Sequence, residues 1–303
     1  MNTVQIEDVT KTFNGHTAVD SLSLSVPEGC IYGFIGPNGS GKTTTMRMIV
    51  GVLYPDRGAI QVFGKELHGA RSRRIGYLPE ERGLYRKMKV RDVLQFYGGL
   101  KMGRSVSKEV DSWLERLDLA KWADQKVEAL SKGMSQKAQF IAAIAAKPEL
   151  LILDEPFSGL DPVNLDTLRE IVLELKAAGT TVIFSTHDMN VAETMCDYIF
   201  MIYQGRKVLD GTLSSIQDSY GQDSVRISCD GGKGVLSDVK GVTHIRDYGN
   251  LQELQIADGV DPQEVVSAVM SRTKVHRFEI ARPSLHDIFV RIAHPTVEEV
   301  HHA

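Results

Sequence analysis

The eight residues Gly36-Pro37-Asn38-Gly39-Ser40-Gly41-Lys42-Thr43 match the pattern G-x-x-x-x-G-K-[ST]. An apolar run over residues 30–35 precedes it, as a buried strand would, and residues 43–53 follow with apolar side chains at helical spacing. Glycines allow the backbone to curl until its N–H groups converge on phosphate oxygens, and the following helix directs its positive end at the same anion. The stretch therefore predicts a loop that binds the phosphates of a nucleotide.

The side chains of this loop indicate how the phosphates and a metal ion are held. Lys42 supplies a cation for the β and γ phosphates, and the Thr43 hydroxyl supplies a ligand for Mg²⁺. A nucleoside triphosphate with Mg²⁺ is therefore expected here. The residues expected to bind the nucleotide are Gly36, Asn38, Gly39, Ser40, Gly41, Lys42, Thr43 and Thr44.

Two acids end a second apolar run, Leu150-Leu151-Ile152-Leu153-Asp154-Glu155. An acid at the end of a buried strand beside a phosphate loop suits a Mg²⁺ site, so Asp154 is expected to hold the ion. Glu155 would then face the γ-phosphate, where it could orient and deprotonate the attacking water. In the alternative interpretation Glu155 only caps a turn before Pro156, and the neighbouring phosphate loop weighs against it.

Composition places the chain among ordinary globular proteins. Of its 303 residues, 42% are hydrophobic and 24% are charged, and a net charge of −4 gives no general attraction to nucleic acid. We therefore expect no nucleic-acid partner. Cys30, Cys196 and Cys229 are odd in number and far apart, which is typical of a reducing compartment. The apolar runs are too short to span a bilayer and the start has no secretory signal, so a cytoplasmic location is expected.

The chain divides into regions of different periodicity. Alternating apolar residues and the Asn14-Gly15 turn signal predict a β-rich beginning, residues 89–148 look helical, and strands then alternate with helices. This alternation predicts a parallel sheet with helices on its faces. After a polar break, a small α/β domain ends in a helix that begins at the capping-box pair Ser284 and Asp287. We expect domains at residues 1–218, with a helical subdomain at about 83–148, and at 219–303.

Four further motifs surround these stretches: Tyr77-Leu78-Pro79-Glu80, Leu130-Ser131-Lys132-Gly133-Met134, Ser158-Gly159-Leu160-Asp161 and Ser185-Thr186-His187-Asp188. Together with the phosphate loop and the acidic pair, their order along residues 1–215 resembles the ATP-binding subunit of an ABC transporter. The resemblance implies an α/β fold with a P-loop NTPase core of the ABC type. Such a core has a mixed sheet, a β-rich N-terminal subdomain and a helical subdomain, here followed by the small C-terminal α/β domain.

The resemblance gives the segment before the acidic strand the role of the family's L-S-G-G-Q signature. Its residues Ser131, Lys132, Gly133 and Met134 would contact the ATP bound to a second subunit. Lys132 and Met134 replace a glycine and the glutamine of the usual motif. The hydroxyl, the second glycine and the helix start remain, so we expect the phosphate contact to survive.

The resemblance also assigns roles to single residues. His187 is the switch histidine, which contacts the γ-phosphate and orients the water, and Asp161 belongs to the D-loop. Phe13 falls where the family keeps an aromatic side chain that stacks on adenine, with packing in the core or hairpin as the alternative. Glu80 stands at the Q-loop position, where a carboxylate can coordinate Mg²⁺, and Glu81 is an alternative holder of that role.

The function implied is a Mg²⁺-dependent ATPase. Two ATP molecules would lie between two such subunits, which are either identical or different chains. Closure on ATP and reopening after hydrolysis would drive a separate transmembrane permease, and the chain would lie on the cytoplasmic face of the cell membrane. Residues 77–85 and 282–289 resemble bacterial exporter-type ATPases associated with sodium, drug or antibiotic efflux.

A soluble ABC-type ATPase that acts on ribosomes or another soluble partner is the alternative. Proteins of that kind usually carry two ATPase modules in one chain and tend to be more basic. This chain has one phosphate loop, one signature and a net negative charge, which favours the transporter subunit.

Overall fold

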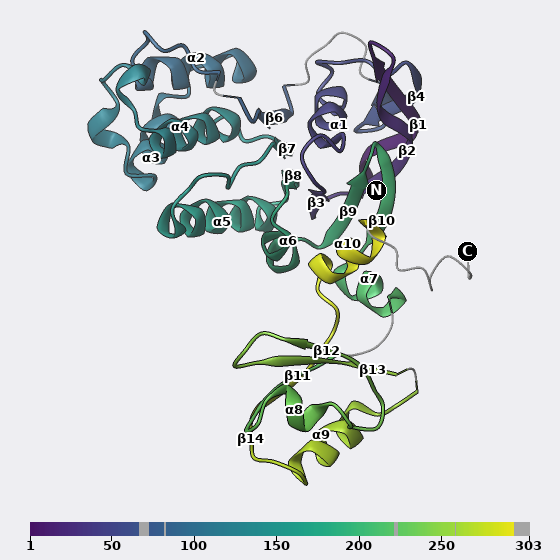
Figure 1. The fold of residues 1–303 in the computed structure, drawn as a ribbon. Helices are drawn as coiled ribbons and strands as arrows, with labels where there is room; N and C mark the ends of the chain where they lie inside the picture. Colours follow the sequence, from purple (N-terminus) through teal and green to yellow (C-terminus); the bar gives the residue numbers. More distant parts are fainter. Residues whose placement is uncertain (67–72, 82, 221–223, 258, 294–303) are drawn as a thin grey trace. The chain divides into compact units, whose positions relative to one another are not determined.

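The computed structural model describes residues 1–66, 73–81, 83–220, 224–257 and 259–293. The chain folds into two compact units, Met1–Leu213 and Ser214–Ala303 (Figure 1). The helix α7 (Leu213–Ser219) begins where the two units meet in sequence. The first unit contains both the phosphate loop and the acidic strand, and the second has a sheet and an apolar core of its own.

An antiparallel sheet in the order β2-β1-β4-β5 forms the N-terminal part of the first unit. Its strands are β1 (Asn2–Phe13), β2 (His16–Pro27), β4 (Arg57–Val62) and β5 (Lys65–Glu66). β1 and β2 are joined by Asn14 and Gly15, whose φ angles of 47° and 82° suit a tight hairpin turn. The predicted β-rich beginning and its turn are confirmed.

A six-stranded sheet in the order β10-β9-β3-β8-β7-β6 forms the centre of the first unit. Five of its strands run parallel, and β10 runs antiparallel to β9. The sheet is therefore mixed, as the resemblance implied. Its strands are β3 (Ile31–Ile35), β6 (Ile75–Leu78), β7 (Leu150–Leu153), β8 (Thr181–Thr186), β9 (Tyr198–Tyr203) and β10 (Arg206–Gly211).

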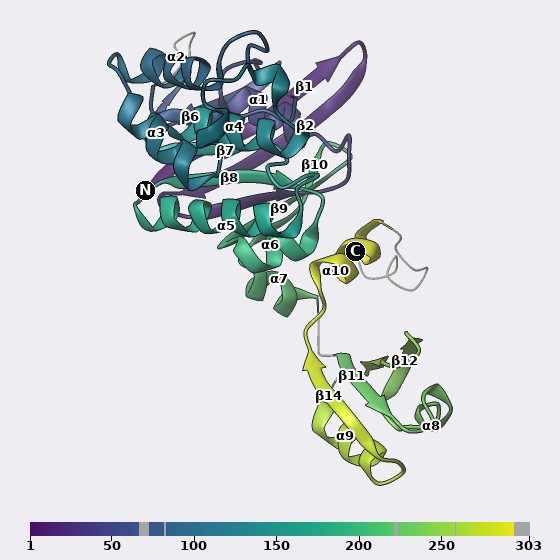
Figure 2. The same cartoon turned by 90° about the vertical axis from the view of Figure 1, so that its left-hand side faces the viewer.

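Apolar side chains pack on both faces of this sheet. Ile31 of β3 belongs to the core cluster that includes the helices beyond residue 89, whereas Tyr32 and Phe34 belong to the cluster shared with β1 and β2. The sheet is covered by α1 (Lys42–Ile49), α5 (Pro162–Ala177) and α6 (Met189–Met195), and Figure 2 shows α5 and α6 along one side of it. Burial on both faces fixes the strand ends from which the phosphate loop and the acidic pair project.

The helical part of the first unit is built from three α-helices and two short 3₁₀ turns. These are α2 (Val90–Met102), α3 (Ser107–Arg116), α4 (Lys132–Ile144) and the turns Ala120–Trp122 and Val127–Ala129. Buried apolar residues of all three helices join one core cluster with β7 and β8. Within the part of the chain that the structure describes, no helix has the length and apolar character needed to cross a membrane.

The second unit has the β-α-β-β-α-β order of a ferredoxin-like sandwich. Its elements are β11 (Ser224–Cys229), α8 (Lys233–Leu236), β12 (Val242–Asp247), β13 (Gln252–Ile256), α9 (Pro262–Met270), β14 (Val275–Ala281) and the added helix α10 (Leu285–Ala293). The antiparallel sheet has the order β12-β13-β11-β14, and its apolar face packs on α8 and α9. The small α/β domain is thus present.

Candidate nucleotide-binding and catalytic site

The phosphate loop joins β3 to α1, as the sequence predicted. Gly36 and Gly41 both have positive φ, 151° and 110°, and Gly41 is the N-cap of α1. A Cβ on Gly41 would lie 2.5 Å from the carbonyl oxygen of Ala18, and one on Gly36 would press against that of Ile202. A larger residue would displace the backbone of β2 or β9, so the loop needs glycine at both positions.

A cavity of about 330 Å³ opens at the loop. It is lined by Ala18, Asn38, Gly39, Ser40, Gly41, Lys42, Thr43, Thr44, Glu80 and Glu155. The structure therefore brings seven of the expected nucleotide-binding residues to one space, together with acids that follow β6 and β7. Gly36, the eighth, shapes the loop without lining the cavity. The lining is polar and contains the start of α1, which suits an anionic ligand.

Lys42 carries the positive charge of the cavity. Its side chain is only 6% exposed, and its Nζ donates hydrogen bonds to the carbonyl oxygens of Gly36 at 2.8 Å and Pro37 at 3.1 Å. Nζ also lies 3.9 Å from Oε1 of Glu155. Burial lowers the pKa of Lys42, and the nearby carboxylates of Glu155, Asp154 and Glu80 only partly offset that effect.

Asp154 follows β7 directly and is almost completely buried. Its Oδ1 accepts hydrogen bonds from the Ser185 hydroxyl at 2.6 Å and the Thr43 hydroxyl at 3.2 Å. Its buried Oδ2 has no hydrogen-bond partner among the residues that the structure describes. An unpaired carboxylate oxygen beside a threonine hydroxyl is the hard oxygen donor set that Mg²⁺ prefers, so these residues fit the expected ion.

Glu155 is held in an unusual backbone conformation, with φ of 51°. Its N–H donates to the Ser185 hydroxyl at 2.9 Å, and its side chain is 9% exposed. The two carboxylate oxygens lie 3.1 Å and 3.0 Å from Nδ1 of His187, whose own side chain is 55% exposed. A left-handed conformation is costly for a residue with a Cβ, and the contacts of the Glu155 N–H and carboxylate help to hold it here.

Of the two acids considered for the Q-loop position, Glu80 lines the cavity. Glu81 is turned away from it: its side chain is 89% exposed and lies 3.9 Å from Nη2 of Arg47.

Phe13, the expected adenine-stacking residue, ends β1 with 40% of its surface exposed. The Nζ of Lys11 lies 5.4 Å from the centre of the Phe13 ring, so one aromatic face is engaged by a cation.

The signature segment forms the start of α4. Ser131 is the N-cap, and its Oγ accepts a hydrogen bond from the N–H of Met134 at 3.3 Å. Lys132 and Gly133 lie in the first turn. A Cβ on Gly133 would meet Leu160 only at 3.8 Å, an ordinary van der Waals distance. The surrounding chain therefore leaves room for a side chain at this glycine.

Asp161 is the N-cap of α5 and accepts a hydrogen bond from the N–H of Asn164 at 3.0 Å, which lowers its pKa. Among the described residues that line the nucleotide cavity, neither Asp161 nor any of residues 131–134 is found. The signature and the D-loop are thus not brought to the phosphate loop within one chain.

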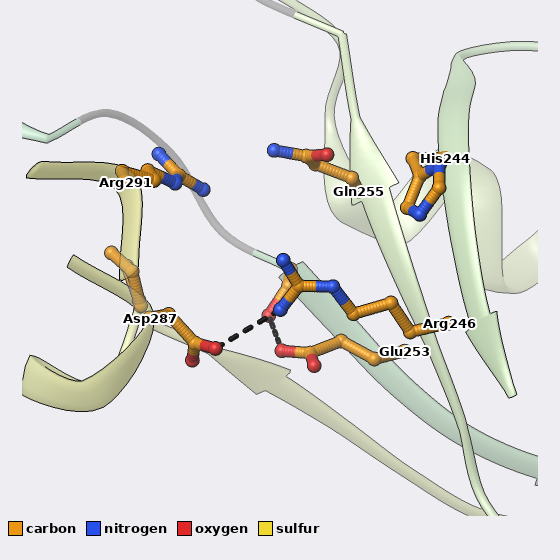
Figure 3. Close-up of a pocket in the computed structure, with 8 residues that line it drawn as sticks. His244, Arg246, Glu253, Gln255, Asp287 and Arg291 are labelled. Carbon is orange, nitrogen blue, oxygen red and sulfur yellow. Dashed lines mark hydrogen bonds and ion pairs between the residues drawn. The ribbon is translucent and has the colours of Figure 1, made fainter. Parts of the chain in front are cut away.

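A small polar hollow lies in the second unit, between the sheet and α10 (Figure 3). Nη1 of Arg246 lies 3.0 Å from Oδ1 of Asp287, and the hydroxyl of Ser224 donates to Glu253 at 2.9 Å. Burial raises the pKa of Asp287, but hydrogen bonds from Ser284 and the guanidinium of Arg246 outweigh it, and the pKa is lowered. The pair of Arg246 in β12 and Asp287 in α10 therefore ties α10 to the sheet.

Comparison with known proteins decides the family. A family model for ABC transporters matches residues 19–158, and one for the C-terminal domain of DrrA1-3-like ATP-binding proteins matches residues 211–293. Over 287 residues, the chain is 45% identical to the uncharacterized ABC transporter ATP-binding protein YhaQ of Bacillus subtilis, with 94% of this chain and 96% of that protein covered. The chain belongs to the ABC transporter ATP-binding proteins. ATP-binding domains of this family are ATPases.

Two further relatives of this ABC transporter ATP-binding protein have named roles. This chain is 31% identical to the linearmycin resistance ATP-binding protein LnrL of Bacillus subtilis, with 98% of this chain and 100% of LnrL covered. It is 32% identical to the daunorubicin/doxorubicin resistance ATP-binding protein DrrA of Streptomyces peucetius, over 96% and 93% of the two chains.

Solved structures of ABC proteins share the fold. An ATP-binding subunit of an ABC transporter superposes with a TM-score of 0.68 at 31% identity, over 72% of this chain and 93% of that chain. CbiO1 of Clostridium perfringens, part of the ABC transporter complex cbiONQ, gives a TM-score of 0.62 at 25% identity, over 72% and 92%. The ABC-type core that the ordered motifs predicted is confirmed.

Two residues at the site were not singled out by sequence reasoning. Ala18 of β2 lines the cavity, and Ser185 of β8 links Asp154 to Glu155. Ser185 stands two residues before His187, within a motif that the sequence shows, but its hydrogen-bond partners, Asp154 and Glu155, follow another strand, β7.

Proposed function

We propose that this ABC protein binds and hydrolyses ATP with Mg²⁺ and thereby powers export through a separate transmembrane subunit. One observation carries the proposal. The carboxylate of Glu155 lies between Nζ of Lys42 and Nδ1 of His187 at the cavity of the phosphate loop. A buried carboxylate with a cation on one side and an imidazole on the other is suited to take a proton from water.

Different residues of the cavity bind the phosphates, hold the metal and activate the water. The N–H groups of residues 38–44 and the ammonium of Lys42 bind the phosphates, and Thr43 and Asp154 hold the metal. Mg²⁺, when bound, neutralises charge on the β and γ phosphates. Glu155 orients and deprotonates the attacking water, while His187 positions Glu155 and contacts the γ-phosphate. Glu80 takes the Q-loop role beside the metal, and Phe13 stacks on adenine.

A few ligands from the protein are enough for this ion. Among the described residues there is no group of three or more His, Cys, Asp or Glu that could form a metal cage. Mg²⁺ is commonly held by one or two carboxylates together with substrate phosphates and waters. One carboxylate, Asp154, and one hydroxyl, Thr43, fit that pattern.

The active unit is a dimer, formed with a second copy or with a different ATPase chain. Support comes from the signature, which lies outside the cavity of its own chain and offers a helix N-terminus with an open glycine. Ser131, Lys132, Gly133 and Met134 would complete the ATP site of the other subunit and stabilise charge on its γ-phosphoryl group. Asp161 lies in the D-loop of the same interface. Binding of ATP closes the dimer and hydrolysis reopens it.

A hollow of about 320 Å³ near the Q-loop supports docking of a transmembrane permease. Its lining is mainly apolar and includes Val50, Val52, Ile75, Tyr77, Pro79, Leu84, Tyr97 and Ala142.

The named roles of LnrL and DrrA in drug resistance favour export as the direction of transport. We place the chain on the cytoplasmic face of the membrane, without a nucleic-acid partner. We propose that the ATPase domain covers residues 1–218 and the small C-terminal α/β domain residues 219–303.

The test is purification of the tagged chain from gently solubilised cells, with mass spectrometry of bound proteins. We expect a polytopic membrane protein in stoichiometric amount. The Val52→Asp variant, altered at a half-exposed position of the hollow, should lose that protein and keep its ATPase activity. Leu173→Asp, at an exposed position of α5, is the matched control and should retain it. Ribosomal proteins or soluble proteins alone would contradict the transporter role.

A further inference from the structure

The hydroxyl of Ser185 connects the two acids of the site. It lies on β8, is fully buried, and is within hydrogen-bond distance of Oδ1 of Asp154 at 2.6 Å and of the N–H of Glu155 at 2.9 Å. The direction of both bonds follows from chemistry. A backbone N–H can only donate, so the hydroxyl accepts from Glu155, and its single proton is donated to Asp154.

We infer that Ser185 is a positioning residue for ATP hydrolysis, which orients the metal-binding carboxylate and the general base through one hydroxyl. The inference rests on the roles proposed above for Asp154 and Glu155. It goes beyond them because Ser185 does not itself line the nucleotide cavity.

The bond to Asp154 determines which carboxylate oxygen remains available. Ser185 and Thr43 both donate to Oδ1, which leaves the buried Oδ2 without a partner among the described residues. Thr43 is itself an expected metal ligand. When its oxygen coordinates the ion, Ser185 is the remaining hydroxyl that holds the Asp154 carboxylate in place. Partners of this kind typically change metal affinity or activity 10–100-fold when removed.

The bond to the Glu155 N–H anchors the strained part of the backbone. Glu155 has φ of 51°, and this conformation directs its side chain toward Lys42 and His187. Strained residues persist where their surroundings hold them in place. Without the Ser185 hydroxyl, the N–H of Glu155 loses the partner that holds the turn, and a carboxylate displaced from the productive geometry is a poor general base.

The chain offers a matched control on the same strand. Thr181 begins β8 and is also buried, and its hydroxyl accepts the N–H of Gly29 at 2.9 Å and bonds the Thr3 hydroxyl at 3.0 Å. Like the hydroxyl of Ser185, the Thr181 hydroxyl therefore bonds one backbone N–H and one side-chain oxygen, but at the opposite end of β8. Thr181→Ala reports the cost of losing a buried hydroxyl of β8 without any change at the site.

The experiment compares wild type, Ser185→Ala, Ser185→Thr and Thr181→Ala in the full chain. Three quantities are measured: the melting temperature, kcat for ATP, and the affinity for fluorescent ADP with and without Mg²⁺. We expect Ser185→Ala to lower kcat and the Mg²⁺-dependent gain in ADP affinity about 10–100-fold, with metal-free affinity within about twofold. Ser185→Thr keeps the hydroxyl and should stay near wild type, as should Thr181→Ala, even if its melting temperature falls.

Three results would overturn the inference: Ser185→Ala with wild-type kcat and Mg²⁺ response, Ser185→Thr as impaired as Ser185→Ala, or Thr181→Ala equally impaired in kcat. The wild type serves as a separate test. A wild-type chain without Mg²⁺-dependent hydrolysis would refute the proposed function together with this inference. If the wild type hydrolyses ATP and Ser185→Ala matches it in kcat and in its Mg²⁺ response, the inference alone is refuted.

Discussion

Nδ1 of His187 lies 3.1 Å and 3.0 Å from the two carboxylate oxygens of Glu155. The two residues follow neighbouring parallel strands, β8 and β7, whose carboxyl ends meet at one edge of the central sheet. The contact therefore depends on the sheet topology and on the left-handed backbone of Glu155. It holds the carboxylate of Glu155, the proposed general base, in a defined direction.

Replacing His187 by alanine should remove that direction. We expect kcat for ATP to fall about 100-fold or more, because positioning and proton transfer at this pair are both lost. Affinity for ADP, which has no γ-phosphate for His187 to contact, should stay within about twofold, since Lys42 and the loop are unchanged. Steady-state kinetics and a binding titration measure both. His276→Ala is the matched control, because His276 forms a similar pair with Asp230 at 2.8 Å in the second unit. Equal kcat values for His187→Ala and the control would contradict the role of His187.

Mixing two inactive variants tests whether the site is completed across a dimer. Lys42→Ala should lose nucleotide affinity in its own cavity, while Gly133→Asp should place a negative charge where the signature meets a phosphate. A mixed dimer pairs the intact phosphate loop of one chain with the intact signature of the other. We expect the mixture to recover about a quarter of wild-type activity, since random pairing gives half mixed dimers with one working site each. No recovery on mixing would show that signature and loop act within one chain.

The pair formed by Arg246 and Asp287 predicts that the local stability of α10 depends on pH. Because the pKa of Asp287 is lowered in the folded chain, its contribution to stability is present above the ordinary value of 3.8 and is lost as the pH falls through the lowered value. Asp287→Asn should lower the local stability of α10 by about 1 kcal/mol at neutral pH. Hydrogen exchange of the α10 amides should show faster exchange, and the difference from wild type should shrink below pH 3.8.

The neighbouring strand provides the control for that measurement. Arg277 and Glu279 form a pair at 3.2 Å on β14, but their side chains are 70% and 49% exposed. Exposed pairs of this kind contribute little, so Arg277→Gln should leave α10 exchange unchanged. Equal exchange in Asp287→Asn and wild type at neutral pH would contradict the tie.

Local signals in the sequence predicted much of the fold because they act over a few residues. The phosphate loop between a buried strand and a helix is one example, and the capping box of α10 is another. There the Ser284 hydroxyl accepts the N–H of Asp287 at 3.1 Å and donates to its carboxylate at 2.6 Å. The interactions that form each motif join residues a few positions apart, so the local sequence is enough to predict the motif.

The features that were missed depend on distant parts of the chain. β12 alternates weakly, and none of its six residues is fully buried, because it is an edge strand with few core contacts. α8 has four residues, too few for a helical period. The partners of Ser185, Asp154 and Glu155, lie about 30 residues away in sequence, just after the neighbouring strand β7. Strand neighbours follow from sheet topology, which periodicity does not contain.

Glu155→Gln tests the role of Glu155 in hydrolysis most directly, because it keeps the size of the side chain and removes its charge. Hydrolysis should fall about 100-fold or more, while ATP still binds. With ATP and Mg²⁺ the variant should elute as a closed dimer in size-exclusion chromatography, and without them as a monomer. Glu149→Gln, at the residue just before β7 and therefore at the opposite end of that strand from Glu155, should hydrolyse ATP normally. If Glu155→Gln instead turns over ATP at the wild-type rate, Glu155 is not the general base.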